Sequence, residues 1–216
     1  AGTSNERNMT PMQNCKLVAS GLDTGPMLAA LANDPGLWSE ITVRQDYPGS
    51  AHHDTECIFA RGPEAFTPEK FFFDLGSYDY PAMDKLADVL VPVLRPLLND
   101  VLKVTELGRV LIVNLKAGGL VDEHIDEGTY ADHFARFHVV VSTNPFCYNI
   151  TGGEAAHWPV GECWWFDHKQ AHSAVNQGET DRVHIIIDAV TSEFPMPQVP
   201  VSTNGAATVA DIVGQA

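Results

Sequence analysis

Short apolar runs separated by polar or glycine-containing connections dominate the second half of the chain. Four of them predict buried strands, over residues 110–115, 136–141, 161–166 and 182–188. Apolar runs of this length, bounded by turn residues, are typical of strands buried inside a protein. In the first half, the pattern predicts a helix over residues 24–33 and short strands over residues 41–44 and 57–60.

One long helical pattern precedes these strands, over residues 81–101. Apolar side chains recur there at intervals of three and four positions, which gathers them on one face of a helix. Pro81 suits the first turn, whereas Pro92 and Pro96 lie inside the pattern and predict a kink or a split. We expect this helix to support a sheet.

Helices followed by short strands predict a mostly β protein with supporting helices, for which a sandwich or jelly roll is the natural closed form. We expect an N-terminal helical or mixed part over residues 1–103 that packs on a β core over residues 104–190. A proline-rich tail over residues 191–216 is expected to end in a short helix. The length of 216 residues suits one structural domain.

Charge and cysteine content narrow the classes of partner. The chain has 13 Lys and Arg against 28 Asp and Glu, a formal net charge of −15, so long-range repulsion opposes binding to a phosphate backbone. No stretch approaches the roughly 20 apolar residues of a membrane span. The four cysteines form no Cys-x-x-Cys pair and are ordinary for a reduced protein. We expect a cytoplasmic protein with neither a nucleic-acid nor a membrane partner.

Histidines are concentrated in the predicted β core, where seven of the nine lie between Asp122 and Asp188. Two histidines and one carboxylate on one face of a metal form the site of non-haem ferrous oxygenases, and the remaining positions stay open. The first two ligands commonly come as His-x-Asp or His-x-Glu. Two segments contain such a pair, residues 52–54 and residues 124–126. The second is preferred because it lies between two predicted core strands, whereas the first follows a turn-like stretch outside them.

An arginine that follows it in the sequence helps to choose the second histidine ligand among four candidates. A bound 2-oxoglutarate needs a cation for its far carboxylate, and a bidentate arginine serves best. Arg182 opens an apolar strand ten residues after His172, and strand alternation puts Arg182, His184 and Ile186 on one face. This favours His172 over the other three candidates, His157, His168 and His184. A salt bridge of Arg182 to Asp167 or Asp188 is the alternative explanation.

Arg136 and His138 repeat this arrangement on a neighbouring predicted strand. They share one face of it and are candidates for contacts to the same co-substrate. The alternative is a surface arginine beside a core histidine.

Five motifs in a fixed order resemble the aspartyl/asparaginyl β-hydroxylase family, with spacing most similar to bacterial L-proline cis-4-hydroxylases. They are His124-x-Asp126, Arg136-x-His138, the segment from Gly161 to Asp167, His172-Ser173-Ala174, and Arg182 in an apolar strand that ends at Asp188. The resemblance implies a double-stranded β-helix (jelly roll, cupin-like) that uses Fe(II), 2-oxoglutarate and molecular oxygen. It implies His124, Asp126 and His172 as the catalytic iron ligands and Arg182 as the carboxylate anchor. Arg136 and His138 are implied as further co-substrate contacts.

The resemblance also bears on the substrate. Vertebrate members lack the carboxylate ligand that Asp126 supplies here, which favours hydroxylation of an unactivated C–H bond in a small amino-acid-like molecule. Two alternatives stay open: a hydroxylase of a peptidyl Asp or Asn or another protein side chain, and a non-catalytic jelly-roll binding module. Arg61 or Arg109 is the candidate partner for a substrate carboxylate.

Other residues have two interpretations each. Trp164 and Trp165 are core or pocket wall, and Asp167 caps a turn or orients His172. A surface loop is slightly favoured over a substrate mouth for His52, His53, Asp54 and Arg61. A long connection between strands, where substrate loops often lie, contains Asn144, Tyr148 and Trp158.

Overall fold

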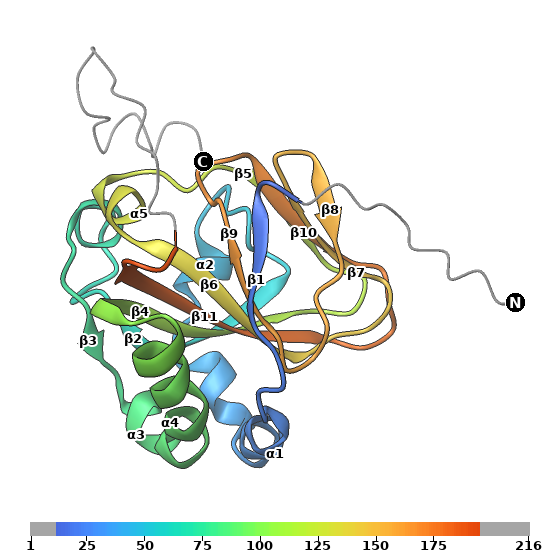
Figure 1. Cartoon of the computed structure of the whole chain (residues 1–216), viewed down its shortest axis with the longest axis horizontal. Coiled ribbons are helices and arrows are strands. Elements are labelled where there is room, and N and C mark those ends of the chain that lie inside the picture. The colour runs from blue at the N-terminus through green and yellow to red at the C-terminus, as the bar shows by residue number, and fades with distance from the viewer. Residues whose placement is uncertain (1–11, 195–216) are drawn as a thin grey trace, which may run out of the picture.

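The computed structural model describes residues 12–194, and Figure 1 shows how their elements are arranged. All strand pairs in this part of the chain are antiparallel. The strands are β1 (Cys15–Ala19), β2 (Thr55–Gly62), β3 (Tyr78–Asp79), β4 (Val104–Leu115), β5 (Leu120–His124), β6 (Ala135–Ser142), β7 (Cys147–Thr151), β8 (Glu154–Ala156), β9 (Cys163–Phe166), β10 (His172–Asn176) and β11 (Arg182–Thr191).

Helical segments precede or connect these strands. The α-helices are α1 (Gly25–Asn33), α2 (Val43–Asp46), α3 (Pro81–Lys85), α4 (Ala87–Pro96) and α5 (Thr129–His133). Three further turns of helix are the 3-10 helix η1 (Pro35–Ser39) and the π-helical segments η2 (Glu69–Phe73) and η3 (Leu97–Val101). None of the helices in residues 12–194 is both long and apolar enough to cross a membrane.

Two sheets face each other and make up the core of the fold. The larger has seven strands in the order β1-β9-β6-β11-β4-β2-β3, and the smaller has four in the order β5-β10-β7-β8. From β4 to β11 the chain passes back and forth between the two sheets, and of these strands only the β7–β8 hairpin stays within one sheet. This winding is a double-stranded β-helix, or jelly roll, and it confirms the predicted fold class.

Each strand of the larger sheet has one face toward the helices and one toward the smaller sheet. In β11, Val183, Ile185, Ile187 and Ala189 belong to the main apolar cluster, together with Leu90, Val93 and Leu94 of α4. Helices α1, α3 and α4 lie against this outer side of the sheet (Figure 1). The alternate residues of β11, from Arg182 to Asp188, point into the space between the two sheets. The predicted division of this strand into two faces is therefore confirmed.

Most of the predicted elements are present, with one clear error. The helix over residues 24–33 corresponds to α1, and the strands over 57–60, 110–115, 136–141, 161–166 and 182–188 correspond to β2, β4, β6, β9 and β11. The strand predicted over residues 41–44 is wrong, because Val43–Asp46 forms helix α2. The helical pattern over residues 81–101 is split near Leu86 and again after Pro96, while Pro92 lies inside α4 without ending it.

The N-terminal residues contribute strands to the larger sheet. Strand β1 pairs with β9, and β2 pairs with β4, so residues before Val104 extend the sheet on both sides of the jelly-roll strands. The division at residues 103 and 104 stays a prediction. The short helix predicted at the end of the tail lies outside the described residues.

Candidate metal centre

Strand pairing in the smaller sheet brings two histidines together. His124 is the last residue of β5 and His172 is the first residue of β10, and the two are direct partners across this antiparallel pair. Their ring centroids are 4.3 Å apart. Two residues 48 positions apart in sequence therefore meet because β5 and β10 are neighbours in the sheet.

Asp126 lies two residues beyond the end of β5, in a loop that is held by the chain before β10. Its backbone N–H donates to the carbonyl of His168 at 3.2 Å, and the Lys169 ammonium donates to its carbonyl at 2.8 Å. Lys169 also pairs with Asp132 of α5. These contacts turn the Asp126 carboxylate toward both histidines.

The three side chains form a set of donor atoms that suits one metal ion. Their ligand atoms all lie within 4.8 Å of one another, and Nε2 of His124 is 3.6 Å from Oδ1 of Asp126. Nδ1 of His124 donates to the carbonyl of Asp122 at 2.8 Å, and Nδ1 of His172 donates to that of Gln170 at 2.9 Å. In each ring Nε2 is left with the lone pair that a metal needs, and Nε2 of His124 is buried without a hydrogen-bond partner.

Burial and nearby charges keep His172 and Asp126 in their ligating forms. Burial lowers the pKa of His172 to about 4, so its imidazole is neutral near neutral pH. Burial by itself would raise the pKa of Asp126, but the Arg136 guanidinium and the nearby histidines outweigh it and hold that pKa well below its usual range. The set contains two imidazoles and one carboxylate, which are the donor types of the facial triad in non-haem ferrous sites.

Arg136 is held between two carboxylates. Its Nη1 donates to Oδ2 of Asp126, and its Nε and Nη2 donate to the buried Asp188 at 2.7 and 3.1 Å. Tyr130 donates to Asp188 as well, at 3.2 Å. The sequence predicted Arg136 as a co-substrate contact, and its side chain lines both cavities described below. Its hydrogen bonds in the structure, however, are to Asp126 and Asp188.

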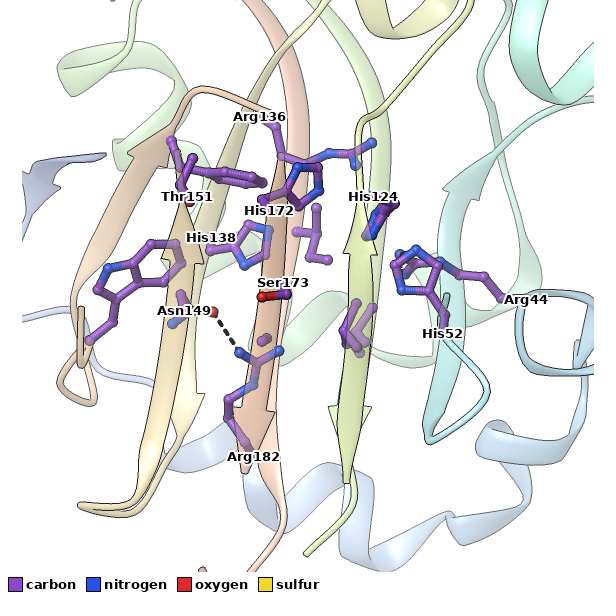
Figure 2. A pocket seen from close by; sticks show the side chains of 16 residues that line it. Arg44, His52, His124, Arg136, His138, Asn149, Thr151, His172, Ser173 and Arg182 are labelled. Atoms are coloured by element: carbon purple, nitrogen blue, oxygen red, sulfur yellow. Dashed lines mark hydrogen bonds between the residues drawn. The ribbon is translucent and has the colours of Figure 1, made fainter. Parts of the chain in front are cut away.

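Arg182 lies in an inner cavity beside the two histidines (Figure 2). Only 4% of the residue is exposed, Nη1 donates to Oδ1 of Asn149 at 2.6 Å, and Nε has no partner. Burial lowers the pKa of its guanidinium to about 10, a value at which it is still protonated near neutral pH. No carboxylate in residues 12–194 pairs with it, because Asp188 pairs with Arg136 and Asp167 bonds within its own turn. The alternative of a salt bridge is therefore contradicted.

A second group of polar atoms without partners surrounds Arg182. His138 lines the inner cavity, and its Nδ1 lies 3.1 Å from Nδ1 of His184. The Nε2 atoms of both histidines and Nε1 of Trp158 are buried without hydrogen-bond partners. Because buried polar groups in proteins are nearly always paired, these atoms indicate space for a polar ligand. Burial also holds the pKa values of His138 and His184 well below the usual range.

An outer cleft opens on the other side of the metal centre. It shares His124 and Arg136 with the inner cavity and is completed by residues from the N-terminal half, namely residues 43–52 around α2 and residues 66–72 around η2. Gly128, with φ of +93°, allows the loop after Asp126 to pass against η2, since a Cβ there would lie 2.4 Å from the carbonyl oxygen of Phe72. The loop that carries a metal ligand therefore also forms a wall of this cleft.

Several residues that the sequence analysis named as candidates for substrate or metal-supporting contacts make other contacts in the structure. Arg61 pairs with Asp79 at 2.7 Å on the molecular surface, and His53 pairs with Asp54 and Asp122. Asp167 caps its own turn, accepting from the backbone of Lys169, and makes no hydrogen bond to His172.

The residues predicted in the long connection between strands lie in different environments. Asn144 binds the turn before β11 through Thr180, and 38% of Tyr148 is exposed. Trp158 lines the inner cavity, and its ring stacks on that of Trp164 at 5.7 Å.

Sequence reasoning missed three polar residues at the site, namely Asn149, Thr151 and Arg44, and favoured a surface loop over a substrate mouth for His52. Asn149 and Thr151 of β7 line the inner cavity, and Arg44 and His52 line both cavities. The ring of His52 lies edge-on to that of His124 with centroids 4.8 Å apart, so the expectation of a surface loop at His52 is wrong. In the structure β7 alternates between buried and less buried residues, which directs Asn149 and Thr151 to the cavity, but the sequence of this short strand gave no signal for it.

The contacts of Arg136 lead to a prediction about metal affinity. Arg136→Gln is expected to weaken Fe(II) binding by about 10- to 100-fold, because the carboxylate of Asp126 loses the group that orients it. The same change leaves Asp188 buried without a counter-charge, which should cost roughly 3–5 kcal/mol of unfolding free energy. Anaerobic Fe(II) titration and urea denaturation measure the two effects.

Asp188→Asn is the matched control, because it weakens the same buried cluster but leaves Arg136 bonded to Asp126. It should destabilise the fold with a smaller loss of Fe(II) affinity. If Arg136→Gln instead left Fe(II) affinity unchanged and raised the 2-oxoglutarate requirement, Arg136 would be a direct co-substrate contact.

Both curated proteins and solved structures are similar to this chain. The L-proline cis-4-hydroxylase of Rhizobium meliloti (strain 1021) is 28% identical over 119 residues, which are 55% of this chain and 42% of that protein. The chain thus matches less than half the length of this relative.

Two of the solved structures to which this chain is similar are the following. A 2OG-Fe(II) oxygenase family oxidoreductase from Burkholderia pseudomallei has a TM-score of 0.48 at 11% identity, over 74% of this chain and 76% of that one. The viral collagen prolyl hydroxylase from Paramecium Bursaria Chlorella virus-1 also has a TM-score of 0.48, at 13% identity, over 82% of this chain and 96% of that one.

A family model described as aspartyl/asparaginyl beta-hydroxylase matches residues 72–192. This range holds β4 to β11, and with them His124, Asp126, His172 and Arg182. It covers more than half of the chain and includes every motif that carried the resemblance. The chain belongs to the aspartyl/asparaginyl β-hydroxylase family.

Proposed function

We propose that this chain is an Fe(II)- and 2-oxoglutarate-dependent dioxygenase that hydroxylates an unactivated C–H bond of a small amino-acid-like substrate. The observation that carries the proposal is Arg182, a buried guanidinium without a carboxylate partner that faces the same cavity as His124 and His172. A buried charge without a counter-charge costs several kcal/mol, so such a residue indicates an anionic ligand. A dicarboxylate that reaches from the metal to Arg182 meets this requirement.

One set of side chains would hold the metal, and a second set would bind the co-substrate. His124, Asp126 and His172 would hold Fe(II) through Nε2 of each ring and the carboxylate. Arg182, oriented by Asn149, would bind the far carboxylate of 2-oxoglutarate, and His138 is placed for a further contact in the same cavity. When bound, the iron would couple oxidative decarboxylation of 2-oxoglutarate by molecular oxygen, giving succinate and carbon dioxide, to hydroxylation of the substrate.

The apolar walls of the inner cavity would keep water away from this reaction. Val113, Phe166 and Ile186 line it together with the polar groups. Exclusion of water strengthens the attraction between Arg182 and a carboxylate, since the effective dielectric constant is lower there.

Two observations support a small amino-acid-like substrate. The chain has a carboxylate, Asp126, among its candidate ligands, and a similar curated relative is named L-proline cis-4-hydroxylase. A peptidyl substrate is the competing proposal, because the outer cleft is open to solvent along residues 122–127.

The test is an assay of succinate formation. Purified protein with Fe(II), 2-oxoglutarate and oxygen is offered free L-amino acids, L-proline first, and peptides that contain Pro, Asp or Asn. We expect succinate and a hydroxylated product, mass increased by one oxygen atom, from one or more free amino acids. Turnover confined to peptides would overturn the small-molecule proposal but not the oxygenase. The absence of succinate and of Fe(II)-dependent binding of 2-oxoglutarate would leave a non-catalytic jelly-roll module.

Two further parts of the proposal concern the cellular compartment and the domain organisation. We propose a cytoplasmic protein, because Cys15, Cys57, Cys147 and Cys163 are all buried free thiols, as a reducing compartment allows. We also propose that residues 1–103, the β core and the tail form one structural domain, because β1 and β2 are hydrogen-bonded members of the larger sheet.

A further inference from the structure

Arg44 is a second arginine beside the metal centre that has no acidic partner in residues 12–194. It lies in α2, outside the segment that the family model matches. Its Nη2 is 3.0 Å from Nε2 and 3.2 Å from Nδ1 of His52, and its Nη1 is buried with no hydrogen-bond partner. An imidazole offers a lone pair but no negative charge, so the guanidinium is left uncompensated.

The position of Arg44 relates it to the metal centre. His52, which it contacts, lies edge-on to His124, and Arg44 itself lines both the inner cavity and the outer cleft. Figure 2 shows Arg44 and Arg182 approaching His124 and His172 from different sides. Arg182 and Arg44 are thus two separate cations without carboxylate partners in the described residues, one at each end of the space around the candidate metal ligands. Two carboxylate-bearing ligands, rather than one, would satisfy both.

The two arginines that the sequence offered for a substrate carboxylate have contacts that Arg44 lacks. Arg61 is paired with Asp79, so it is not available to a substrate. Arg109 lines the cleft and, within residues 12–194, has no carboxylate partner and an unpaired Nε, but its Nη2 donates to the carbonyl of Phe71 at 2.7 Å. Its guanidinium also lies 3.6 Å over the ring of Tyr130, which holds it in place and covers it. The sequence predicted Arg61 or Arg109 as the partner of a substrate carboxylate. The contacts of the three side chains favour Arg44 instead.

The charged side chains that line the outer cleft are positive at its inner end and negative at its solvent-exposed rim. Arg44 lies at the junction with the inner cavity, whereas Glu123 and Glu127 are exposed and line the outer cleft. Neither glutamate forms an ion pair within the described part of the chain. A molecule with a carboxylate at one end and an ammonium group at the other matches this order when its carboxylate enters first.

We propose that Arg44 is the anchor for the carboxylate of the substrate, and that the outer cleft selects small molecules with a free carboxylate, entering with that group toward the metal centre. The carboxylate meant is the α-carboxylate of a free amino acid. The proposal rests on the proposed function and makes it more specific, since an internal residue of a peptide has no free α-carboxylate. Arg182 binds the co-substrate, and Arg44 binds the molecule that is hydroxylated. Arg44 is thus a specificity-determining residue.

The experiment compares acids with their amides on the protein loaded with Fe(II) and 2-oxoglutarate under anaerobic conditions, where nothing turns over. Dissociation constants are measured by calorimetry for a panel of free L-amino acids, beginning with L-proline, and for the matching carboxamides such as L-prolinamide. We expect at least one acid to bind roughly 10- to 100-fold more tightly than its amide, as the loss of one charge-assisted contact implies. Arg44→Gln should remove most of this preference, and Arg44→Lys should keep part of it.

Arg95→Gln is the matched control, because Arg95 is exposed on α4 and lines neither cavity. It should leave the preference for acids as it is in the unmodified protein. The dissociation constant for 2-oxoglutarate, measured on each variant, distinguishes the role of Arg182 in binding the co-substrate from the role of Arg44 in binding the substrate. It should rise strongly in Arg182→Gln and by much less in Arg44→Gln.

Three results would overturn the inference while leaving the oxygenase intact. They are a panel in which no acid binds better than its amide, an unchanged preference in folded Arg44→Gln, and an Arg44→Gln variant whose main loss is in affinity for 2-oxoglutarate. If Arg44→Gln fails to fold, Arg44→Lys and the comparison of acid with amide still decide whether Arg44 binds the substrate carboxylate. The proposed function fails separately, if the unmodified protein shows no Fe(II)-dependent binding of 2-oxoglutarate and forms no succinate.

Discussion

Replacement of His124, Asp126 or His172 by alanine is expected to abolish Fe(II)-dependent turnover while the fold persists. Each change removes one of three ligands, and Fe(II) affinity should fall by more than about 100-fold, beyond the 10- to 100-fold typical of residues that merely support a ligand. The fold should persist because none of the three belongs to the apolar clusters between the sheets and the helices. Anaerobic Fe(II) titration, the succinate assay and circular dichroism measure the three quantities.

His133→Ala is the control for the loss of a histidine. His133 pairs with Glu106 at 2.9 Å, away from the metal centre, so its variant should bind Fe(II) and turn over normally. Normal iron affinity and activity in an alanine variant of any proposed ligand would remove that residue from the site.

Arg182→Met is expected to raise the concentration of 2-oxoglutarate needed for half-maximal activity by roughly 30- to 700-fold. This corresponds to the loss of about 2–4 kcal/mol from a charge-assisted contact in a buried site. Because the methionine also removes a buried charge that lacks a partner, the variant without ligands should be at least as stable as the unmodified protein. A mutation that merely damaged the fold would lower both stability and activity.

The melting temperature with and without 2-oxoglutarate checks this prediction independently of turnover. In the presence of Fe(II), 2-oxoglutarate should stabilise the unmodified protein, and should stabilise Arg182→Met far less at the same concentration. Arg182→Lys should recover part of the affinity, since an ammonium group keeps the charge but not the forked geometry. An unchanged 2-oxoglutarate dependence would contradict the assignment and point to Arg136 as the anchor.

The strands of the larger sheet were predictable because their composition follows from their burial. Strands β4, β6 and β11 are covered by helices on one side and by the smaller sheet and cavity on the other, so they appear as continuous apolar runs. The polar exceptions within these runs, such as Arg136, His138 and Arg182, stood out against that background. For this reason the sequence identified several of the residues that line the inner cavity.

The smaller sheet was not predictable in the same way. Its strands have three to five residues each, and several of them direct polar side chains such as Asn149 and Thr151 into the cavity. Short polar segments give no periodic signal that distinguishes a strand from a loop. The error over residues 41–44 has a related cause, since alternation over four residues is too short to exclude the helix that forms there.

The sequence by itself determined the family, the jelly-roll class and the candidate ligands His124, Asp126 and His172, because these depend on motifs that follow one another at short spacing. Only the tertiary structure decided which groups surround them. It paired Arg136 with Asp126 and Asp188, left Arg182 without a carboxylate, and brought Arg44 and His52 to the metal centre from the N-terminal half. The physical reason is that the charge of a buried group is balanced by neighbours in space, and the pairing of strands, not the order of residues, selects those neighbours.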